Sequence, residues 1–566
     1  MNKRMRLTLI VCLAVVLVLS ACSPETGSVA TTTTSKSSSS STTSSTTSGS
    51  ATSSSSGNES VYPIVDEPIT LTWFKGLDGN QTGAGITDLN QTLYMQEISK
   101  ITGINFEFTH PALGEETTQR NLMFSSGEVT DIINYNFNGY PGGPRKAISD
   151  GIAIDYSELA DQYAPNYKKV VASHPGSEKY FTTDDGLLYG FVNLISLSPE
   201  GTVRVPPEDR EIFEEPVIGL VLRADWLKDL GLEAPTTIDE WYNVLTAFKN
   251  EKNAIAPFTA QLGFMQSPGA FYTAYGVANT YFSDDGSTVK YGPYLPEYKE
   301  FLKTMHKWYD EGLIDSDIFT HTAATVDSRV LNNESGAWAG YSGGGVGAYM
   351  QTARKDNPDF DLVGVPVPTR NKTDKAKGFL SQPFNAAMPC FSATNPYPVE
   401  TMKLIDFFYT DEGDFLINWG VEGTSCEVVD GAYKFTDLLR NDPSGIIVQQ
   451  AMQKYIWWGM GDFATRFALY DAYGDYEGKV VVDSKMTWGK VQNIVLPPLT
   501  MPEEDSKQYS AIMADINTYV SESFADFVTN GISDSGFDEY IATLESMDVE
   551  EAIQMNQAAL ERYKQR

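Results

Sequence analysis

One short motif has the spacing of a serine nucleophile. Residues 340–344 read Gly-Tyr-Ser-Gly-Gly, which fits the G-x-S-x-G turn of serine hydrolases. In such an enzyme a histidine takes the serine proton, and in that fold it follows the serine in the chain. The four histidines of this chain all precede Ser342: His110, His174, His306 and His321. The motif therefore predicts a glycine-rich turn, and we expect no serine hydrolase.

Other catalytic and metal-binding patterns are weaker still. The sequence has no Cys-x-x-Cys pair to accompany its scattered histidines, so it offers no transition-metal site. Residues 343–345 are three glycines followed by Val346, without the Lys-Ser or Lys-Thr of a phosphate-binding P-loop. A glycoside hydrolase needs only two carboxylates, and 74 acidic residues leave that class open as a distant alternative. We expect a protein that is not an enzyme and has no cofactor or metal.

Aromatic residues are abundant in this sequence, with 9 Trp, 30 Tyr and 28 Phe, and their number bears on the kind of ligand. Aromatic rings stack on the C–H faces of sugars, while amides and carboxylates bond the sugar hydroxyls. Such residues cluster at suspected strand ends and around the glycine-rich turn. The candidate ligand-binding residues are Trp73, Tyr135, Asn136, Asn138, Tyr140, Tyr272, Trp338, Tyr341, Trp457 and Trp458. Most aromatic residues are core residues, so the alternative for each is a packing role.

The elements that must position these side chains alternate between strands and helices. Apolar runs predict strands at residues 69–74, 104–108 and 131–135. The segments between them have helical patterns at residues 88–102 and 120–126. This alternation predicts an α/β lobe with a largely parallel sheet, which would bind ligands at the carboxyl ends of its strands.

Helical patterns dominate the later part of the chain. Thr237 and Glu240 have the spacing of a capping box, which predicts the start of a helix. One face of that helix carries Ile238, Trp241, Leu245 and Phe248. Residues 398–409 and 549–564 are also predicted to be helical. No internal repeat of 20–50 residues is visible, which argues against a solenoid or a propeller.

The N-terminal segment predicts export and lipid anchoring. Basic residues precede an apolar run at residues 7–19, which has the layout of a signal peptide and is too short to span a bilayer. Small residues then lead to Cys22, and this segment resembles the lipobox of bacterial lipoproteins. We expect residues 1–21 to be removed and Cys22 to carry lipid such as palmitate. The protein would then be anchored on the outer face of the cytoplasmic membrane.

Composition bounds the rest of the chain. All but three of residues 31–56 are Ser or Thr, so residues 22–61 are predicted to form a disordered tether. The body that follows is too long for one core and favours two lobes. A formal net charge of −33 excludes nucleic acid as an expected partner. Cys390 and Cys426 of the body either form one disulfide or remain two buried thiols.

Four phrases of the body carry a family resemblance by their order and spacing. They are Ser-Gly-Glu-Val-Thr-Asp-Ile-Ile at 126–133, Asp-Gly-Leu-Leu-Tyr-Gly at 185–190, Leu-Arg-Ala-Asp-Trp-Leu-Lys-Asp-Leu-Gly-Leu at 222–232 and Lys-Trp-Tyr-Asp-Glu-Gly-Leu-Ile at 307–314. Together they resemble the bacterial extracellular solute-binding proteins of the family that includes the maltose-binding protein. Within that family, the chain is similar to the large Gram-positive lipoproteins that serve carbohydrate ABC importers.

The resemblance implies a type II periplasmic-binding-protein-like fold, with two α/β lobes that are joined by crossing strands and close on a ligand. Residues 186–195 and 384–391 are the candidate crossings. Lobe 1 would comprise residues 62–188 and about 392–445, and lobe 2 residues 189–385 and about 446–566. Many members carry a calcium loop after the helix that here ends near Lys249. Residues 250–257 contain a single carboxylate, so we do not carry a calcium site over.

The resemblance also implies a function. The protein would act as a monomer that captures an oligosaccharide and delivers it to the permease subunits of an ABC transporter. A receptor for peptides or another polar solute is the alternative, because one fold serves many ligands. The clustering of aromatic residues with Asn at suspected strand ends favours a sugar.

The lipid anchor can be tested by the variant Cys22→Ala. Because the Cys22 thiol is the predicted attachment point, this variant should appear in the medium or remain unprocessed. Membrane fractionation and the mass of the processed chain measure the outcome, with Cys12→Ala, inside the signal, as the control. Mature Cys22→Ala protein that still sediments with membranes would contradict the anchor.

Overall fold

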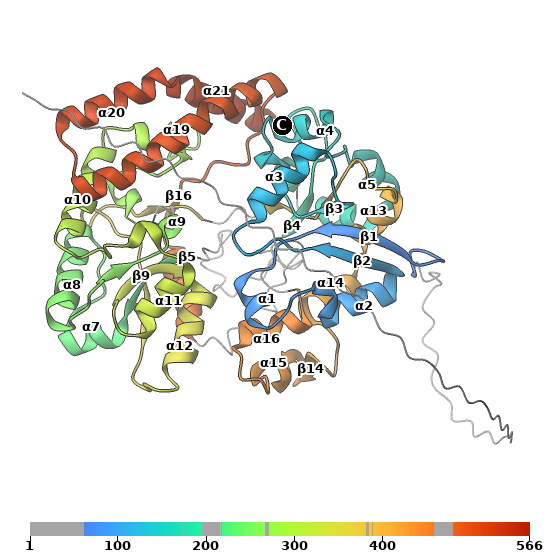
Figure 1. The fold of residues 1–566 in the computed structure, drawn as a ribbon, viewed down its shortest axis with the longest axis horizontal. Helices are drawn as coiled ribbons and strands as arrows, with labels where there is room; N and C mark the ends of the chain where they lie inside the picture. The colour runs from blue at the N-terminus through green and yellow to red at the C-terminus, as the bar shows by residue number, and fades with distance from the viewer. Residues whose placement is uncertain are drawn as a thin grey trace, which may run out of the picture. The chain divides into compact units, whose positions relative to one another are not determined.

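Two separate sheets organise the protein. The computed structural model describes residues 62–173, 175–194, 216, 218–265, 271–380, 384–387, 389–457 and 479–566. Within these ranges there are two four-stranded sheets, ordered β13-β3-β1-β2 and β10-β5-β9-β6 (Figure 1). The first packs into a core formed by residues 71–192, 390–417 and 457, and the second into a core formed by residues 220–365 and 513–552. We call these the first core and the second core.

The sheet of the first core is mostly parallel, as predicted. β1 pairs in parallel with β2 and β3, and β13 runs antiparallel to β3. Trp73 lies beside Ile132 and Phe74 beside Ile133, so β1 and β3 end at the same edge. The strands are β1 (Ile69–Phe74), β2 (Ile104–Thr109), β3 (Ile132–Ile133) and β13 (Cys390–Phe391). The helices and the hairpin are α1 (Gly79–Gly83), α2 (Leu93–Thr102), α3 (Glu116–Ser126), α4 (Gly143–Ser149), α5 (Ser157–Tyr163), α6 (Pro165–Ala172), α13 (Pro398–Phe407), α14 (Asp411–Trp419), β14 (Cys426–Val429), β15 (Ala432–Phe435), α15 (Asp437–Arg440) and α16 (Val448–Tyr455).

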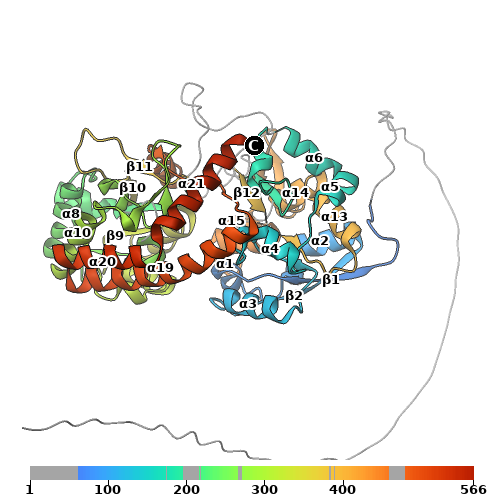
Figure 2. The same cartoon turned by 90° about the horizontal axis from the view of Figure 1, so that it is seen from above.

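The sheet of the second core is mixed. β9 pairs antiparallel with β5 and parallel with β6, and β10 runs antiparallel to β5. Helix α19 packs along α10 (Figure 2). The strands are β5 (Ile218–Arg223), β6 (Phe258–Thr259), β9 (Ala337–Tyr341) and β10 (Leu362–Val365), with the short pairs β7 (Tyr281–Phe282) with β8 (Lys290–Tyr291) and β11 (Lys377–Gly378) with β16 (Gln492–Asn493). The helices are α7 (Ala224–Leu230), α8 (Ile238–Glu251), α9 (Leu262–Met265), α10 (Tyr298–Asp310), α11 (Ala323–Leu331), α12 (Ala348–Ala353), α18 (Lys479–Trp488), α19 (Glu503–Asn530), α20 (Asp534–Ser546) and α21 (Val549–Gln565).

Local sequence patterns predicted several elements well. The strand predicted at 69–74 is β1 with the same bounds. The capping box of α8 is confirmed, because Thr237 Oγ1 accepts from the Glu240 amide and the Thr237 amide donates to the Glu240 carboxylate.

The helix predicted at 88–102 is wrong in its first turn. Thr92 has extended backbone angles, which separate a short 3-10 turn capped by Asp88 from α2. Such a break is set by tertiary packing, which periodicity does not report.

The predicted crossing segments form a pair. β4 (Phe191–Leu194) runs antiparallel to β12 (Phe384–Ala387). The predicted lobe boundary near residue 446 differs from the packing that is observed. α16 packs against α1 and α2, and Trp457 lies in the first core, so the chain stays with that core to at least residue 457. The amphipathic pattern of α16 shows that one face is buried but does not show which core covers it.

The cysteines and the membrane question are resolved for the described residues. Cys390 and Cys426 are both buried and are not joined by a disulfide, which decides between the two alternatives in favour of separate thiols. No helix in the described ranges combines the length and apolar character needed to cross a membrane.

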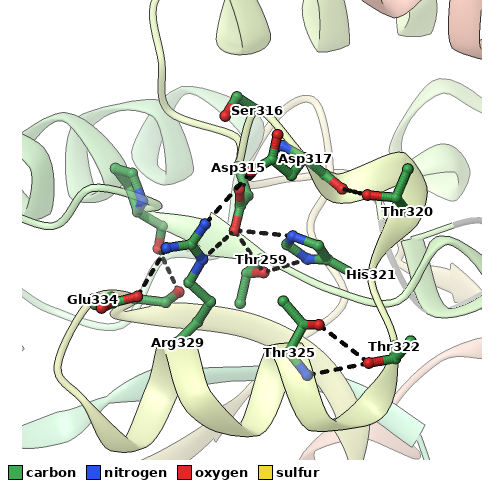
Figure 3. A network of polar contacts seen from close by, with 12 residues as sticks. Thr259, Asp315, Ser316, Asp317, Thr320, His321, Thr322, Thr325, Arg329 and Glu334 are labelled. Atoms are coloured by element: carbon green, nitrogen blue, oxygen red, sulfur yellow. Dashed lines mark hydrogen bonds and ion pairs between the residues drawn. The ribbon is translucent and has the colours of Figure 1, made fainter.

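A partly buried ion cluster connects β6 to helix α11 (Figure 3). Arg329 Nε donates to the Asp315 carboxylate at 3.0 Å, and Arg329 Nη1 donates to Glu334 at 2.8 Å. Asp315 is 1% exposed and also accepts from the hydroxyl of Thr259, which pairs with Trp338 across β6 and β9. The cluster therefore fixes the strand that leads to the glycine-rich turn.

We expect Arg329→Met to destabilise the second core because it leaves the Asp315 carboxylate buried without its guanidinium. Removal of one partner from a fully buried pair costs about 3–5 kcal/mol. Since 21% of the Arg329 side chain is exposed, we expect the free energy of unfolding to fall by about 2–4 kcal/mol. Denaturant titration measures it. Arg354→Met, which breaks a half-exposed pair with Asp361, should cost only about 0–1 kcal/mol. Equal losses would contradict the assignment.

Candidate functional site

The carboxyl ends of β1 and β3 bring two predicted indoles together. Trp73 is fully buried, and its Nε1 donates to Asn134 Oδ1 at 2.8 Å. Trp457 stacks on it, with ring centroids 5.7 Å apart and an interplanar angle of 28°. Lys75, the residue after β1, places its ammonium 5.5 Å from the Trp457 ring centroid. Trp73 is therefore a core support, and Trp457, 7% exposed, covers it.

The segment after β3 holds four more predicted residues. Asn136 caps a 3-10 turn at Phe137–Gly139 by accepting from the Asn138 amide at 3.0 Å. Tyr135 packs against the Arg120 guanidinium, 4.4 Å from its ring centroid. Tyr140 donates to Asp150 at 3.0 Å, and burial, followed by this carboxylate, raises the pKa of Tyr140 to about 12. All four side chains are half-buried at the rim of the first core.

The two polar atoms of the Asn138 side chain differ in their hydrogen bonding. Its Nδ2 donates to the Tyr189 hydroxyl at 2.8 Å. Its Oδ1 is buried and has no hydrogen-bond partner among the described residues. A buried carbonyl without a donor costs free energy, so this oxygen favours a ligand group that donates a hydrogen bond.

A cavity of about 890 Å³ opens beside Asn138 and Tyr140. Its lining comes from both cores, because Tyr140 packs on the first core and Tyr281 and Tyr509 pack on the second. No carboxylate is found among the described residues that line it. The aromatic and polar lining residues are Asn138, Tyr140, Tyr281, Phe379, Thr500, Ser506, Lys507, Tyr509, Ser510, Asn517 and Asn556. The volume is typical of small-molecule sites.

Sequence reasoning missed the wall that the second core contributes. Asn556 is 7% exposed on α21, whose other buried residues are apolar or alanine. An isolated Asn on an otherwise apolar helix face is the sequence feature that could have indicated a polar site. Tyr281 and Tyr509 carried no comparable signal, because a tyrosine within an apolar run fits a core equally well. Burial raises the pKa of both phenols, so their hydroxyls stay neutral at physiological pH.

The glycine-rich turn lies next to α1 and α16 of the first core. Tyr341 is 49% exposed, and its pKa is raised by burial of the hydroxyl and by Asp78, the capping residue of α1 in the first core. Residues Ser342–Gly347 form a π-helix, a conformation that is rare and often functional. Gln449 of α16 lies 3.5 Å from the Gly343 carbonyl oxygen. Tyr341 therefore faces elements of the first core.

Two other predicted residues are buried, Tyr272 in the second core and Trp338 in a separate apolar cluster with Val221 and Tyr349. Trp338 is fully buried against Tyr349, and its Nε1 lacks a hydrogen-bond partner within the described part of the chain. Tyr272 is 1% exposed and stacks on Phe301 with ring centroids 4.1 Å apart. In this conformation neither ring presents a face to solvent. Trp458 and Cys22 lie outside the described residues.

The segment after α8, to which no calcium site was carried over, holds an ion pair. Lys252, after α8, places its ammonium 2.7 Å from the Asp229 carboxylate. Among the described residues there is no group of three or more His, Cys, Asp or Glu that could hold a metal ion. The metal-free expectation stays a prediction.

Two α/β cores that are linked by paired strands and share a cavity define the class of two-lobed solute-binding proteins. The family model of the bacterial extracellular solute-binding proteins matches residues 94–414, more than half of the chain. The protein belongs to this family.

Relatives and solved structures agree with that assignment. The fructooligosaccharide ABC transporter substrate-binding protein FusA of Streptococcus pneumoniae is 24% identical over 502 residues, 84% of this chain and 88% of FusA. Lipoprotein LipO of Bacillus subtilis is 25% identical over 340 residues, 57% of this chain and 64% of LipO. The alginate-binding protein AlgQ2 has a TM-score of 0.70 at 23% identity, covering 88% of this chain and 99% of AlgQ2. FusA in complex with kestose has a TM-score of 0.67 at 21% identity, with the same coverage.

Two residues of β9, Trp338 and Tyr341, differ in burial, and we expect their replacement to have very different effects on stability. Trp338→Ala should lower the free energy of unfolding by about 3–5 kcal/mol because it leaves a large cavity. Tyr341→Ala, at a half-exposed position, should change it by no more than about 0.5 kcal/mol. Chemical denaturation of both variants measures these values. Similar losses at the two positions would show that Tyr341 is also a core residue.

Proposed function

We propose that the protein captures an oligosaccharide between its two cores and delivers it to the permease of an ABC importer. Membership of the solute-binding family supports capture and delivery. The chemistry of the cavity that lies beside Asn138 supports the sugar.

The composition of the cavity wall carries the proposal. Sugar rings combine apolar C–H faces with hydroxyls that both donate and accept hydrogen bonds. The described wall offers tyrosine rings for the faces, and Asn138 and Asn517 for the hydroxyls, while the Asn556 amide is already bonded to the Ala552 carbonyl. A volume of about 890 Å³ accommodates more than one sugar ring. FusA and AlgQ2 are described as fructooligosaccharide- and alginate-binding proteins, and their fold is shared here.

Two other functions fit the wall less well. A peptide receptor would be expected to pair the charged peptide termini with fixed carboxylate and cationic groups, whereas the described wall has one ammonium, that of Lys507, and no carboxylate. A glycoside hydrolase needs two carboxylates that flank the scissile bond. None is present among the described lining residues, and Ser342 of the nucleophile-like motif is buried.

The cellular setting follows from the N-terminus and the family. Lipid on Cys22 would hold the body at the outer face of the membrane, within reach of the permease. The sites proposed to contact the sugar are Asn138 and Tyr140 in the cavity, Trp457 above Trp73, Tyr341 on the turn and, beside them, Tyr135 and Asn136. Trp338, Tyr272 and Trp73 would support these residues from buried positions.

A thermal-shift screen of the Cys22→Ala protein tests the ligand class. The panel contains fructo-oligosaccharides, malto-oligosaccharides, uronate oligosaccharides and a peptide mixture. A ligand that binds only the folded state adds about 2.7 kcal/mol at 100 times its dissociation constant, so a true ligand should raise the unfolding midpoint. A response to peptides without a response to any sugar would overturn the proposal.

The variant Asn138→Ala links the response to the cavity. It removes the open acceptor, so the affinity for a responding sugar should fall by about 5–30-fold, equivalent to about 1–2 kcal/mol. Asn530→Ala, which removes an exposed amide at the far end of α19, is the matched control. Wild-type affinity in Asn138→Ala would place the sugar elsewhere.

A further inference from the structure

An ion cluster connects the two cores beside the crossing strands. Asp184 Oδ2 accepts from Arg562 Nε at 2.7 Å, and Asp184 Oδ1 accepts from Thr500 Oγ1 at 2.9 Å. Arg562 Nη2 also donates to the Thr500 carbonyl at 3.3 Å. The three residues thus close a ring of contacts, in which Thr500 takes part through its hydroxyl and its main-chain carbonyl. We call Asp184, Thr500 and Arg562 the Asp184 cluster.

The members of this cluster belong to different cores. Asp184 lies between Phe181 and Leu188, which are buried in the first core, on the loop that leads into β4. Arg562 lies on α21, whose residues Val549 and Ala552 are buried in the second core. Figure 2 shows α21 extending from the side of α19 to the C-terminal end of the chain. The cluster therefore bridges the cores next to the β4–β12 pair.

A second arginine strengthens the same junction. Arg566 donates to the carbonyls of Thr182 at 2.8 Å and Lys179 at 3.1 Å, both on the loop that carries Asp184. The rings of Tyr563 and Tyr180 also meet, with centroids 6.5 Å apart. One side of α21 thus contacts the first core through several independent bonds. Such a network holds geometry better than an isolated surface pair does.

The cluster is also part of the frame of the cavity. Thr500 lines the cavity, and so does Asn556, which lies on the same helix as Arg562. On the opposite wall, Asn138 bonds the Tyr189 hydroxyl, which donates to the Tyr180 carbonyl at 2.9 Å. Both walls are therefore tied to the loop at residues 180–184. A change at Asp184 would alter the spacing between Asn138 and Asn556.

We propose that Asp184 and Arg562 are positioning residues that hold the two walls of the cavity at the separation that binds the ligand. The inference rests on the proposed function only for the identity of that ligand. With the cluster intact, the binding-competent arrangement dominates. When it is lost, the competent fraction falls and the apparent dissociation constant rises by the inverse of that fraction. The cluster touches no ligand itself.

The experiment measures the spacing of the cores without any ligand. Spin labels are placed on exposed helices of the two cores, at Gln119→Cys on α3 and Lys228→Cys on α7, in the full chain that carries Cys12→Ala and Cys22→Ala. Cys390 and Cys426 are buried and can stay. Double electron–electron resonance then gives the distance distribution. We expect one narrow population in the parent and an additional population at a different distance in Arg562→Gln and in Asp184→Asn.

Two control variants make the result specific. Arg562→Lys keeps the charge and should retain the parent distribution. Arg354→Gln breaks an Arg–Asp pair that lies within the second core and should also leave the distribution unchanged. Circular dichroism confirms that each variant is folded. Parent-like distributions in both Arg562→Gln and Asp184→Asn would overturn the proposal, as would equal broadening in Arg354→Gln. The sugar screen decides the proposed function separately, because the distance measurement needs no sugar.

Discussion

The pairing of β4 with β12 is the constraint on which the rest of the structure depends. Its register joins Phe191 to Ala387 and Leu194 to Phe384, so two segments that are distant in sequence form one ribbon. The ribbon is attached to the first core. Tyr409 donates to the Val192 carbonyl at 2.6 Å, and β12 continues into β13, which pairs with β3. A two-stranded ribbon bends more easily than a packed sheet, so freedom of motion is expected where it leaves the first core.

This constraint explains why many of the aromatic residues are not available to a ligand. Each core must be complete on its own, because the other core cannot be relied on to cover it. Trp73 and Tyr272 fill these cores, and Trp338 is buried in the cluster with Val221 and Tyr349. Side chains that face the shared cavity come instead from loops and helix ends, as Asn138 and Thr500 do. Trp457 combines both roles, since its ring covers Trp73 while Lys75 lies over it.

The sequence predicted what local chemistry determines. The apolar run of β1 and the capping box of α8 depend on neighbouring residues. β1 has the predicted bounds, and α8 begins after Thr237 as predicted but ends at Glu251, two residues beyond the expected end. Of the predicted site residues, Asn138 and Tyr140, which follow β3, line the cavity, because the end of a strand can be recognised in an α/β pattern. Tyr272 and Trp338, predicted on the other lobe, are buried instead. Asn556, Tyr281 and Tyr509 reach the cavity from elements far apart in the chain. Their convergence depends on how α21 packs on α19, which no local pattern contains. The same reason accounts for the placement of α16 and Trp457 with the first core.

The absence of carboxylates from the described cavity wall has a physical reason in a chain with a net charge of −33. When two lobes close on a ligand, water leaves the cavity, and each carboxylate there would lose its hydration. An acidic wall would therefore oppose closure unless the ligand brought a cation. Removing an amide or a hydroxyl from water costs less free energy than removing a carboxylate. Hydrogen bonds to the sugar hydroxyls then offset this cost. The acidic residues can then keep the exposed surface soluble without opposing closure, which separates the charge of the protein from the chemistry of its site.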